Sequence, residues 1–429
     1  MGAATLAASP EVAPIDVAAL REEHAERWRT TRAELPDLGP RVGWRRHFGN
    51  ERAAGRLVDS LADELDRLPA DEEGRRAWRD SVSGRLRAFG AERLGWPGGY
   101  GRLLFADAFL DSSVGFARAA RAFDPTLPIE GLGQALRNVW IGNSLQMRLG
   151  REVRCGEGLF AYSMLYPLTD NRLDDPRLDA SAKRAFNRRF GRRLAGEPVT
   201  PADAAEAAVF ALVSRIEGEY PRREYPEVHE SLLAIHAGQT LSLAQQDDPE
   251  LDDGDLLDIS CEKGGTSVLA DLWLVAGEAD EAEQRFAFGY GVFLQLLDDL
   301  QDVGNDLAAG HQTLFTRAAA RGPLDAPAAR LARFVDEVLD GEPLADEAAA
   351  ERRDLVRRNC RTLLVASIAA QPRRFTWRFR RAIERRWPFT LGAMRRLRAR
   401  AEKRFAKPLA ELRDPDRAGA RLDEALAGL

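Results

Sequence analysis

Cysteine is scarce in this chain, and long apolar runs are missing. The 429 residues include three cysteines, Cys155, Cys261 and Cys360, which are odd in number and far apart. This pattern indicates neither a disulfide framework nor a zinc site, and it favours a reducing compartment. No stretch approaches 18 apolar residues, so we expect no transmembrane helix. The N-terminus lacks the basic start and apolar core of a signal peptide, so we expect a cytoplasmic protein.

Lysine is almost absent, and basic residues do not dominate. Arginine and lysine together number 62 against 68 acidic residues, which gives a formal net charge of -6. The lysines are Lys183, Lys263, Lys403 and Lys407. A nucleic-acid partner would require a basic surface overall. We therefore expect no binding to nucleic acid.

Strongly β-branched, alternating runs are also scarce, whereas Ala, Leu, Arg and Glu are abundant. This composition favours an all-α fold, with helices over residues 57–68, 77–89, 129–149 and 157–175. Three parts are expected from the length and from breaks in the pattern. Residues 1–40 form an N-terminal tail, disordered to about residue 15. Residues 41–345 form the main helical domain, and residues 346–429 form a C-terminal extension.

The C-terminal extension carries paired arginines interleaved with aromatic residues. The pairs begin at Arg357, Arg373, Arg380, Arg385 and Arg395. A basic amphipathic segment of this kind is suited to an anionic membrane surface or to a diphosphate. The alternative is a helix whose arginines are solvated and paired with the acidic body of the protein. The sequence alone leaves both interpretations open.

One segment, residues 291–302 (GVFLQLLDDLQD), combines an apolar helix with a concentrated set of acids. Asp298, Asp299 and Asp302 lie at i, i+1 and i+4, so they project from one side of a helix, and Gln295 points the same way. Crowded carboxylates repel one another unless a cation neutralises them. Mg²⁺ commonly binds through one or two carboxylates plus a substrate phosphate. The alternative is a solvated acidic face, which the interleaved leucines argue against.

A second acidic group lies upstream, where Asp170, Asp174 and Asp175 precede a proline. Asp170 and Asp174 are one turn apart and face the same direction. The residue before a proline is biased away from the α region, so we expect the helix to end at Asp175. Carboxylates in the last turn oppose the helix dipole, at a cost of a few tenths to about 1 kcal/mol each. A metal is one compensating cation, and an acidic loop paired with Arg172 and Arg177 is the alternative.

Residues 291–302 resemble the second aspartate-rich motif of the trans-prenyltransferases, within the class I isoprenoid synthase superfamily. That motif reads G-x-x-F-Q-x-x-D-D-x-x-D, and here one leucine separates Phe293 from Gln295. The family's first D-D-x-x-D motif ends a helix well over a hundred residues earlier, and the segment from Asp170 has that placement. Asn171 takes the place of the second aspartate there, and Asp175 is an addition.

Two more elements of the family's order lie between the acidic segments. Gln239 resembles the glutamine of G-Q-x-x-D-L, with Ser242 at the usual Asp position. Lys263 and Thr266 resemble a Lys-Thr pair with two glycines inserted, and at i and i+3 they still share a helix face. The resemblance implies that Lys263 contacts the substrate diphosphate as a point charge; the alternative is a surface lysine paired with Glu262. The glycines admit either a close substrate or a neighbouring helix.

A basic element of the family is degraded in this chain. The stretch at 133–137 takes the position of G-K-R-x-R-P, which binds the second substrate, isopentenyl diphosphate. Gln134 and Ala135 replace the first two cations, and Arg137 is the only one retained. A pocket for a second diphosphate needs several positive charges. The sequence therefore supports a site for one diphosphate better than a site for two.

The resemblance implies a class I isoprenoid synthase helical bundle around a central cavity. It also implies about three Mg²⁺ ions that stabilise departing pyrophosphate from an all-trans prenyl diphosphate. The implied metal ligands are Asp170, Asp174, Asp175, Asp298, Asp299 and Asp302. The implied substrate contacts are Lys263, Thr266, Gln239, Gln295, Arg137 and Phe293. Rings suited to lining the cavity around a carbocation are Phe160, Tyr162, Tyr166, Trp273 and Phe293.

Three functions stay open at this point. The degraded basic element favours a terpene synthase-like lyase that cyclises or quenches one ionised substrate. The D-D-x-x-D form of the second motif favours a chain-elongating transferase that uses isopentenyl diphosphate. A catalytically lapsed binding subunit is the third interpretation. The sequence also leaves a homodimer open.

Overall fold

The computed structural model describes residues 13–413, except residues 66, 68, 70, 98, 102–106, 176, 244, 246–249 and 342–345. For residues 72, 75, 174 and 407–413 it describes the backbone alone. Regular structure in the described part is entirely helical, which confirms the expected all-α fold. The elements in chain order are α1 (Val17–Thr30), α2 (Trp44–Leu65), α3 (Glu72–Phe89), the π-helix η1 (Gly90–Leu94), α5 (Asp107–Phe123), α6 (Ile129–Arg148), α7 (Glu157–Asp174), α8 (Ala180–Leu194), α9 (Ala204–Glu219), α10 (Pro226–Ser242), α12 (Asp253–Ala276), α13 (Glu281–Ala309), α14 (Leu314–Arg321), α15 (Asp325–Asp340), α16 (Glu347–Ala370), the 3-10 helix η2 (Pro372–Arg374), α17 (Trp377–Glu384) and α18 (Leu391–Arg413).

Two long helices, α12 and α13, form the centre of the bundle. Each begins at a capping box, in which an N-cap aspartate and an acid three residues later satisfy each other's backbone N–H groups. The caps are Asp252 with Asp255 for α12, and Asp280 with Glu283 for α13. Both helices end at a glycine in the left-handed region, where a side chain would be strained.

Three glycines let α12 and α13 approach closely. A Cβ atom on Gly291 would overlap the backbone carbonyl of Gly264, and one on Gly265 would overlap the ring of Phe288. The glycines after Lys263 were expected to admit either a substrate or a neighbouring helix, and in the structure they admit the helix α13. The close approach places the first half of α12, with Ser260 and Lys263, beside the acidic half of α13.

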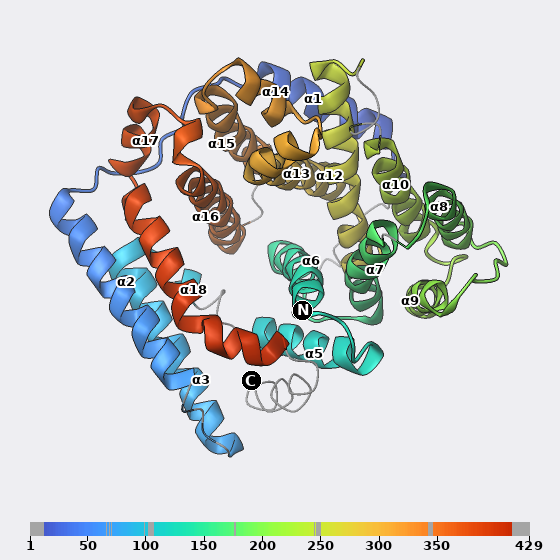
Figure 1. Cartoon of the computed structure of the whole chain (residues 1–429), viewed down its shortest axis with the longest axis horizontal. Helices are drawn as coiled ribbons and strands as arrows, with labels where there is room; N and C mark the ends of the chain where they lie inside the picture. The colour runs from blue at the N-terminus through green and yellow to red at the C-terminus, as the bar shows by residue number, and fades with distance from the viewer. Residues whose placement is uncertain are drawn as a thin grey trace, which may run out of the picture.

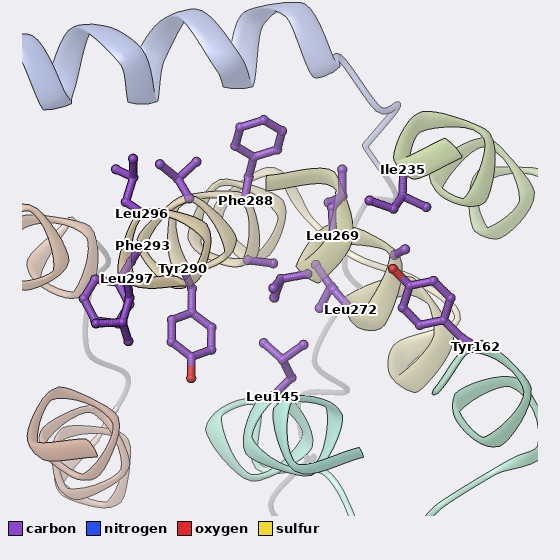
Figure 2. Packing of buried hydrophobic residues seen from close by; sticks show 14 of the residues in the cluster. Leu145, Tyr162, Ile235, Leu269, Leu272, Phe288, Tyr290, Phe293, Leu296 and Leu297 are labelled. Atoms are coloured by element: carbon purple, nitrogen blue, oxygen red, sulfur yellow. The ribbon is translucent and has the colours of Figure 1, made fainter. Parts of the chain in front are cut away.

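The remaining core helices surround this pair. α1, α6, α7 and α10 pack against α12, and α1, α15 and α16 pack against α13. Figure 2 shows apolar side chains from several of these helices meeting between them, among them Leu145 of α6, Tyr162 of α7 and Ile235 of α10. Almost all of these side chains are buried. The bundle therefore supplies a rigid frame for the acidic segment of α13.

The C-terminal helix α18 lies beside α2 (Figure 1). Arg396 pairs with Glu51 at 2.6 Å, and Arg404 and Arg400 both pair with Asp59. Several arginines of the basic extension thus pair with acids of the protein body, as one of the two sequence interpretations describes. Among the described residues, no helix is both long and apolar enough to cross a membrane.

The sequence predicts a tail, a main domain and a C-terminal extension, and each of these three parts contains helices. The tail up to residue 40 contains α1, whose buried side chains include Leu20 and Trp28. Residues 346–413 contribute α16, η2, α17 and α18. Residues 1–12, within the segment expected to be disordered, lie outside the described part. Boundaries at residues 40 and 345 stay predictions.

Candidate active site

The acidic face of α13 divides into exposed and buried carboxylates. Asp298 and Asp302 are exposed to solvent, one turn apart. Asp299 lies on the inner side and is only 5% exposed. Its carboxylate accepts hydrogen bonds from Gln295 Nε2 at 2.8 Å and from Ser260 Oγ at 3.2 Å. Asp298 and Asp302 are thus available to a ligand, whereas Asp299 is held by its neighbours.

The surroundings raise the pKa values of two of these acids. The pKa of Asp298 is raised mainly because the surrounding protein removes water from its carboxylate. Repulsion from Asp302 raises it further. Burial raises the pKa of Asp299 to about 7, although the hydrogen bond from Gln295 acts in the opposite direction. A carboxylate that is crowded in this way gains stability when a cation arrives.

Lys263 of α12 is one such cation, and it faces the acids of α13. Its charge lowers the pKa values of Asp298, Asp299 and Asp306. The alternative in which Lys263 pairs with Glu262 is wrong, because Glu262 pairs with Arg21 at 2.9 Å instead. Lys263 is half-buried. It therefore belongs to the electrostatic surroundings of the acidic face.

Asp306 continues the row of acids and was not among the expected site residues. It lies at i+4 from Asp302, and that carboxylate raises the pKa of Asp306 after the larger effect of burial. Its Oδ1 lies 3.6 Å from Nδ1 of His311. The sequence signal was the i, i+4, i+8 spacing of Asp298, Asp302 and Asp306, which places all three on one face.

The first acidic segment ends α7 at residue 174, as the following proline predicts. Asp170 is half-buried and accepts a hydrogen bond from Gln134 Nε2 at 2.5 Å. Asp175 is bound by the backbone N–H and the guanidinium of Arg177, and these bonds lower its pKa to about 2. The side chain of Asp174 lies outside the described part. Asp175 is therefore paired with Arg177, as in the alternative of an acidic loop that pairs with arginines.

Arg172, the other arginine of that alternative, points elsewhere. Its Nη2 lies 2.5 Å from Oδ2 of Asp203, at the start of α9. This contact directs Arg172 away from the loop and toward α9. Asp170 contacts the neighbouring helix α6 through Gln134.

Helix α6 connects the two acidic segments. Gln134 contacts Asp170 of α7, and Arg137, one turn later, lowers the pKa of Asp298 of α13 through its charge. Both residues belong to the element that was expected to bind a second diphosphate. In the structure, Gln134 and Arg137 interact with one acid from each of the two acidic segments.

The other expected substrate contacts lie deeper. Phe293 and Thr266 are fully buried, and the Thr266 hydroxyl donates to the backbone oxygen of Glu262 at 2.6 Å. Gln239 is half-buried on α10, and Gln295 is committed to Asp299. The structure thus brings Lys263, Arg137 and Gln295 to the acidic face, whereas Thr266 and Phe293 lie in the packed interior.

A buried polar network lies behind the acidic face, and the sequence reasoning did not find it. The amide of Asn138 donates to Oδ1 of Asp271 at 2.9 Å and to Oγ of Ser163 at 3.1 Å. Asp271 is completely buried, and its Oδ2 has no hydrogen-bond partner among the described residues. Burial raises its pKa well above the usual range. An acid inside an apolar stretch of α12 was the only sequence signal.

Two of the aromatic residues expected to line a cavity border a small one. Tyr162 and Tyr166 share a hydrogen bond of 2.8 Å between their hydroxyls, and Tyr166 also bonds to Oγ of Ser267 at 2.6 Å. Next to these rings, and next to Gln239, lies a cavity of about 30 Å³. That volume is about the share of one water molecule in the liquid. A prenyl chain enters here only if side chains move.

The exposed acids of α13 offer oxygen donors of the kind that Mg²⁺ binds. Within the described part of the chain, no group of three His, Cys, Asp or Glu residues is arranged to hold a metal ion. Mg²⁺ retains several waters and commonly binds through one or two carboxylates plus substrate phosphates. Asp298 and Asp302, exposed and one turn apart, offer that donor set.

Comparison with known proteins finds a weak structural likeness. No protein-family profile matches the chain, and no curated protein matches it in sequence. A geranyltransferase from Legionella pneumophila is similar in structure, with 15% sequence identity and a TM-score of 0.37. The likeness covers 68% of this chain and 99% of the geranyltransferase. A TM-score this low carries no conclusion about activity.

Proposed function

We infer that the chain is an Mg²⁺-dependent enzyme that ionises one linear prenyl diphosphate, in the manner of a class I terpene synthase. The observation that carries this proposal is the acidic face of α13, to which α12 directs Lys263 and α6 directs Arg137. Two cations facing two exposed carboxylates form a mixed site. Such a site suits a metal–diphosphate complex, which presents both charges at once.

In the ionisation step, the acidic residues and the basic residues have different roles. Asp298 and Asp302 would hold Mg²⁺, with Asp170 as the candidate ligand from α7. The metal supplies charge that stabilises departing pyrophosphate. Lys263 and Arg137 are placed to bind the same diphosphate oxygens. The allylic C–O bond breaks, its electron pair leaves with pyrophosphate, and the carbocation then loses a proton or adds water.

The contacts of α6 favour one diphosphate over two. A chain-elongating enzyme needs a second group of cations for isopentenyl diphosphate. Here Gln134 bonds to Asp170, and Arg137 acts on Asp298. The element that would bind the second substrate is thereby engaged with the first site. This supports a lyase over a transferase.

A second candidate function is a catalytically lapsed, ligand-binding subunit. The observation that favours it is the small size of the cavity beside Tyr162 and Tyr166, about 30 Å³, which is too little for a hydrocarbon chain. Catalysis requires that Tyr162 and Tyr166, or their neighbours, open this space. A lapsed protein would keep the bundle and lose that movement.

Product analysis separates these functions. The protein is incubated with geranyl, farnesyl or geranylgeranyl diphosphate and Mg²⁺, each with and without isopentenyl diphosphate, and extracts are analysed by mass spectrometry. We expect a hydrocarbon or alcohol from a single substrate. A product longer by five carbons, formed only with isopentenyl diphosphate, would establish chain elongation. No pyrophosphate release from any substrate would establish the lapsed subunit.

A further inference from the structure

A second, much larger cavity lies away from the acidic face. It has a volume of about 720 Å³ and lies between the linker before α2, one face of α16, and the segment that leads into α18. We call it the arginine-lined pocket. None of the aspartates of the two acidic segments lines it. Figure 1 shows the frame of this region, with α2 and α18 on one side and α16 on the other.

Small side chains on α16 create the space. Ala366 and Ala370 lie one turn apart on this helix and are exposed, and both line the pocket. On the same helix, Ser367 is buried and accepts a hydrogen bond from Gln301 of α13 at 3.0 Å. One face of α16 therefore packs on the core while the other is open. A volume of 720 Å³ is far larger than ordinary packing voids and falls in the range of ligand pockets.

Hydrocarbon and aromatic groups form the walls. Trp96 lies against Tyr100, with ring centroids 4.9 Å apart. Across the pocket are Trp387, Phe389 and Met394, all partly exposed. The backbone carbonyl of Trp387 accepts a hydrogen bond from His47 at 3.0 Å, which ties this wall to α2. The walls are therefore suited to a hydrocarbon chain.

The charge at the rim is strongly positive. Eight arginines and two aspartates line the pocket. Four of the arginines have carboxylate partners, with Arg358 on Asp354 and Arg386 on Asp37 among them. Arg395 donates to the backbone oxygen of Ala369 at 3.3 Å.

Three more arginines of the lining, beside Arg395, have no carboxylate partner among the described residues. Within the described part of the chain, Arg41, Arg46 and Arg93 make no ion pair, and all three are exposed or partly exposed. They come from the linker before α2, from α2 and from η1. Guanidinium groups that converge on one cavity without counter-ions favour an anion, because each offers a planar fork of donors that matches phosphate or carboxylate oxygens.

We propose that the arginine-lined pocket binds an anionic amphiphile, a molecule with one hydrocarbon chain and a phosphate or carboxylate head. The chain lies along Trp96, Trp387 and the open face of α16, and the head meets Arg41, Arg46 and Arg93. The pocket is concave and enclosed by three chain segments, so a single molecule fits it better than a membrane surface does. This site is independent of the metal-dependent site on α13.

Calorimetry with four probes tests the proposal, in EDTA so that metal-dependent diphosphate binding is absent. The probes are dodecyl phosphate, dodecanoate, inorganic phosphate and dodecanol, each below the concentration at which it aggregates. We expect 1:1 binding of at least one anionic amphiphile, about tenfold or more tighter than phosphate or dodecanol. Comparison of the first two probes identifies the preferred head. Equal affinity for dodecanol or for inorganic phosphate would overturn the proposal.

Variants locate the site. The triple variant Arg41→Gln, Arg46→Gln, Arg93→Gln should weaken binding about tenfold or more, and Ala366→Phe should do so by filling the space without removing charge. The matched control is Arg184→Gln, Arg188→Gln, Arg223→Gln, which removes three exposed arginines that do not line the pocket. Asp298→Asn should bind as the unaltered protein does. Unchanged affinity in both pocket variants, or binding only to anionic vesicles, would contradict the assignment.

Discussion

Gly291 of α13 and Gly264 of α12 touch through their backbones, so closely that a Cβ on either would overlap the other helix. Lys263 precedes one of these glycines, and Asp298 lies two turns after the other. The contact thus sets how near the cation lies to the acids. Replacing either glycine should force the helices apart and disturb both stability and the site.

Gly291→Ala should lower the free energy of unfolding by about 1–3 kcal/mol, because overpacking displaces the two central helices. Gly304→Ala on the same helix is the matched control, since nothing lies within 4 Å of a Cβ there. That exposed substitution should stabilise the helix by up to about 1 kcal/mol. Urea unfolding measures both, and equal effects of the two substitutions would contradict the close approach.

Asp271 should make stability depend on pH. Burial raises its pKa in the folded protein well above the unfolded value. The folded state therefore holds this proton more tightly, so stability should fall as pH rises from about 4 toward neutral, by up to about 1.4 kcal/mol per pH unit. Asp271→Asn should reduce this slope, and the remainder belongs to Asp299, whose pKa burial also raises. Asp80→Asn, an exposed control on α3, should retain the full slope. Parallel slopes in all three proteins, measured by unfolding at several pH values, would show that Asp271 does not titrate in this way.

Lys263 should bind the diphosphate of the substrate. Its charge acts on Asp298, Asp299 and Asp306, so it lies beside the metal and phosphate groups that the proposal places there. Lys263→Gln should weaken binding of a non-hydrolysable prenyl diphosphate about tenfold at fixed Mg²⁺. Lys183→Gln, on α8, is the control. If calorimetry gives the same affinity for both variants, Lys263 has no part in binding.

The two described acids of the first segment should differ in importance. Asp175 is bound by the guanidinium of Arg177, whereas Asp170 accepts a hydrogen bond from the neutral amide of Gln134 on α6. Asp170→Asn should lower Mg²⁺-dependent pyrophosphate release about tenfold or more, and Asp175→Asn should change it by less than about threefold. The reverse order would place the metal on the loop instead of at the end of α7.

Local rules predicted the helices well. The end of α7 follows from the proline at 176, and the start of α6 follows from Pro128. The acidic face of α13 follows from its spacing alone. Such features depend on neighbours within a few residues, which the sequence displays directly.

Features that depend on distant neighbours were harder to predict. The partner of Asp175 was one of two stated options, and only the position of Arg177 decided between them. The burial of Asp271 depends on Asn138, more than a hundred residues away. The arginine-lined pocket joins Arg41, Trp96, Ala366 and Trp387, and no local pattern relates these positions.

The central claim is that Asp298 supports Mg²⁺-dependent ionisation of a prenyl diphosphate. The most direct measurement is pyrophosphate release from farnesyl and geranylgeranyl diphosphates by the unaltered protein, Asp298→Asn and the control Asp80→Asn, with Mg²⁺ and with EDTA. We expect release by the unaltered protein and the control only with Mg²⁺, a loss of about a hundredfold or more in Asp298→Asn, and the same helical content in all three. Undiminished release by Asp298→Asn, or release that persists in EDTA, would contradict the account.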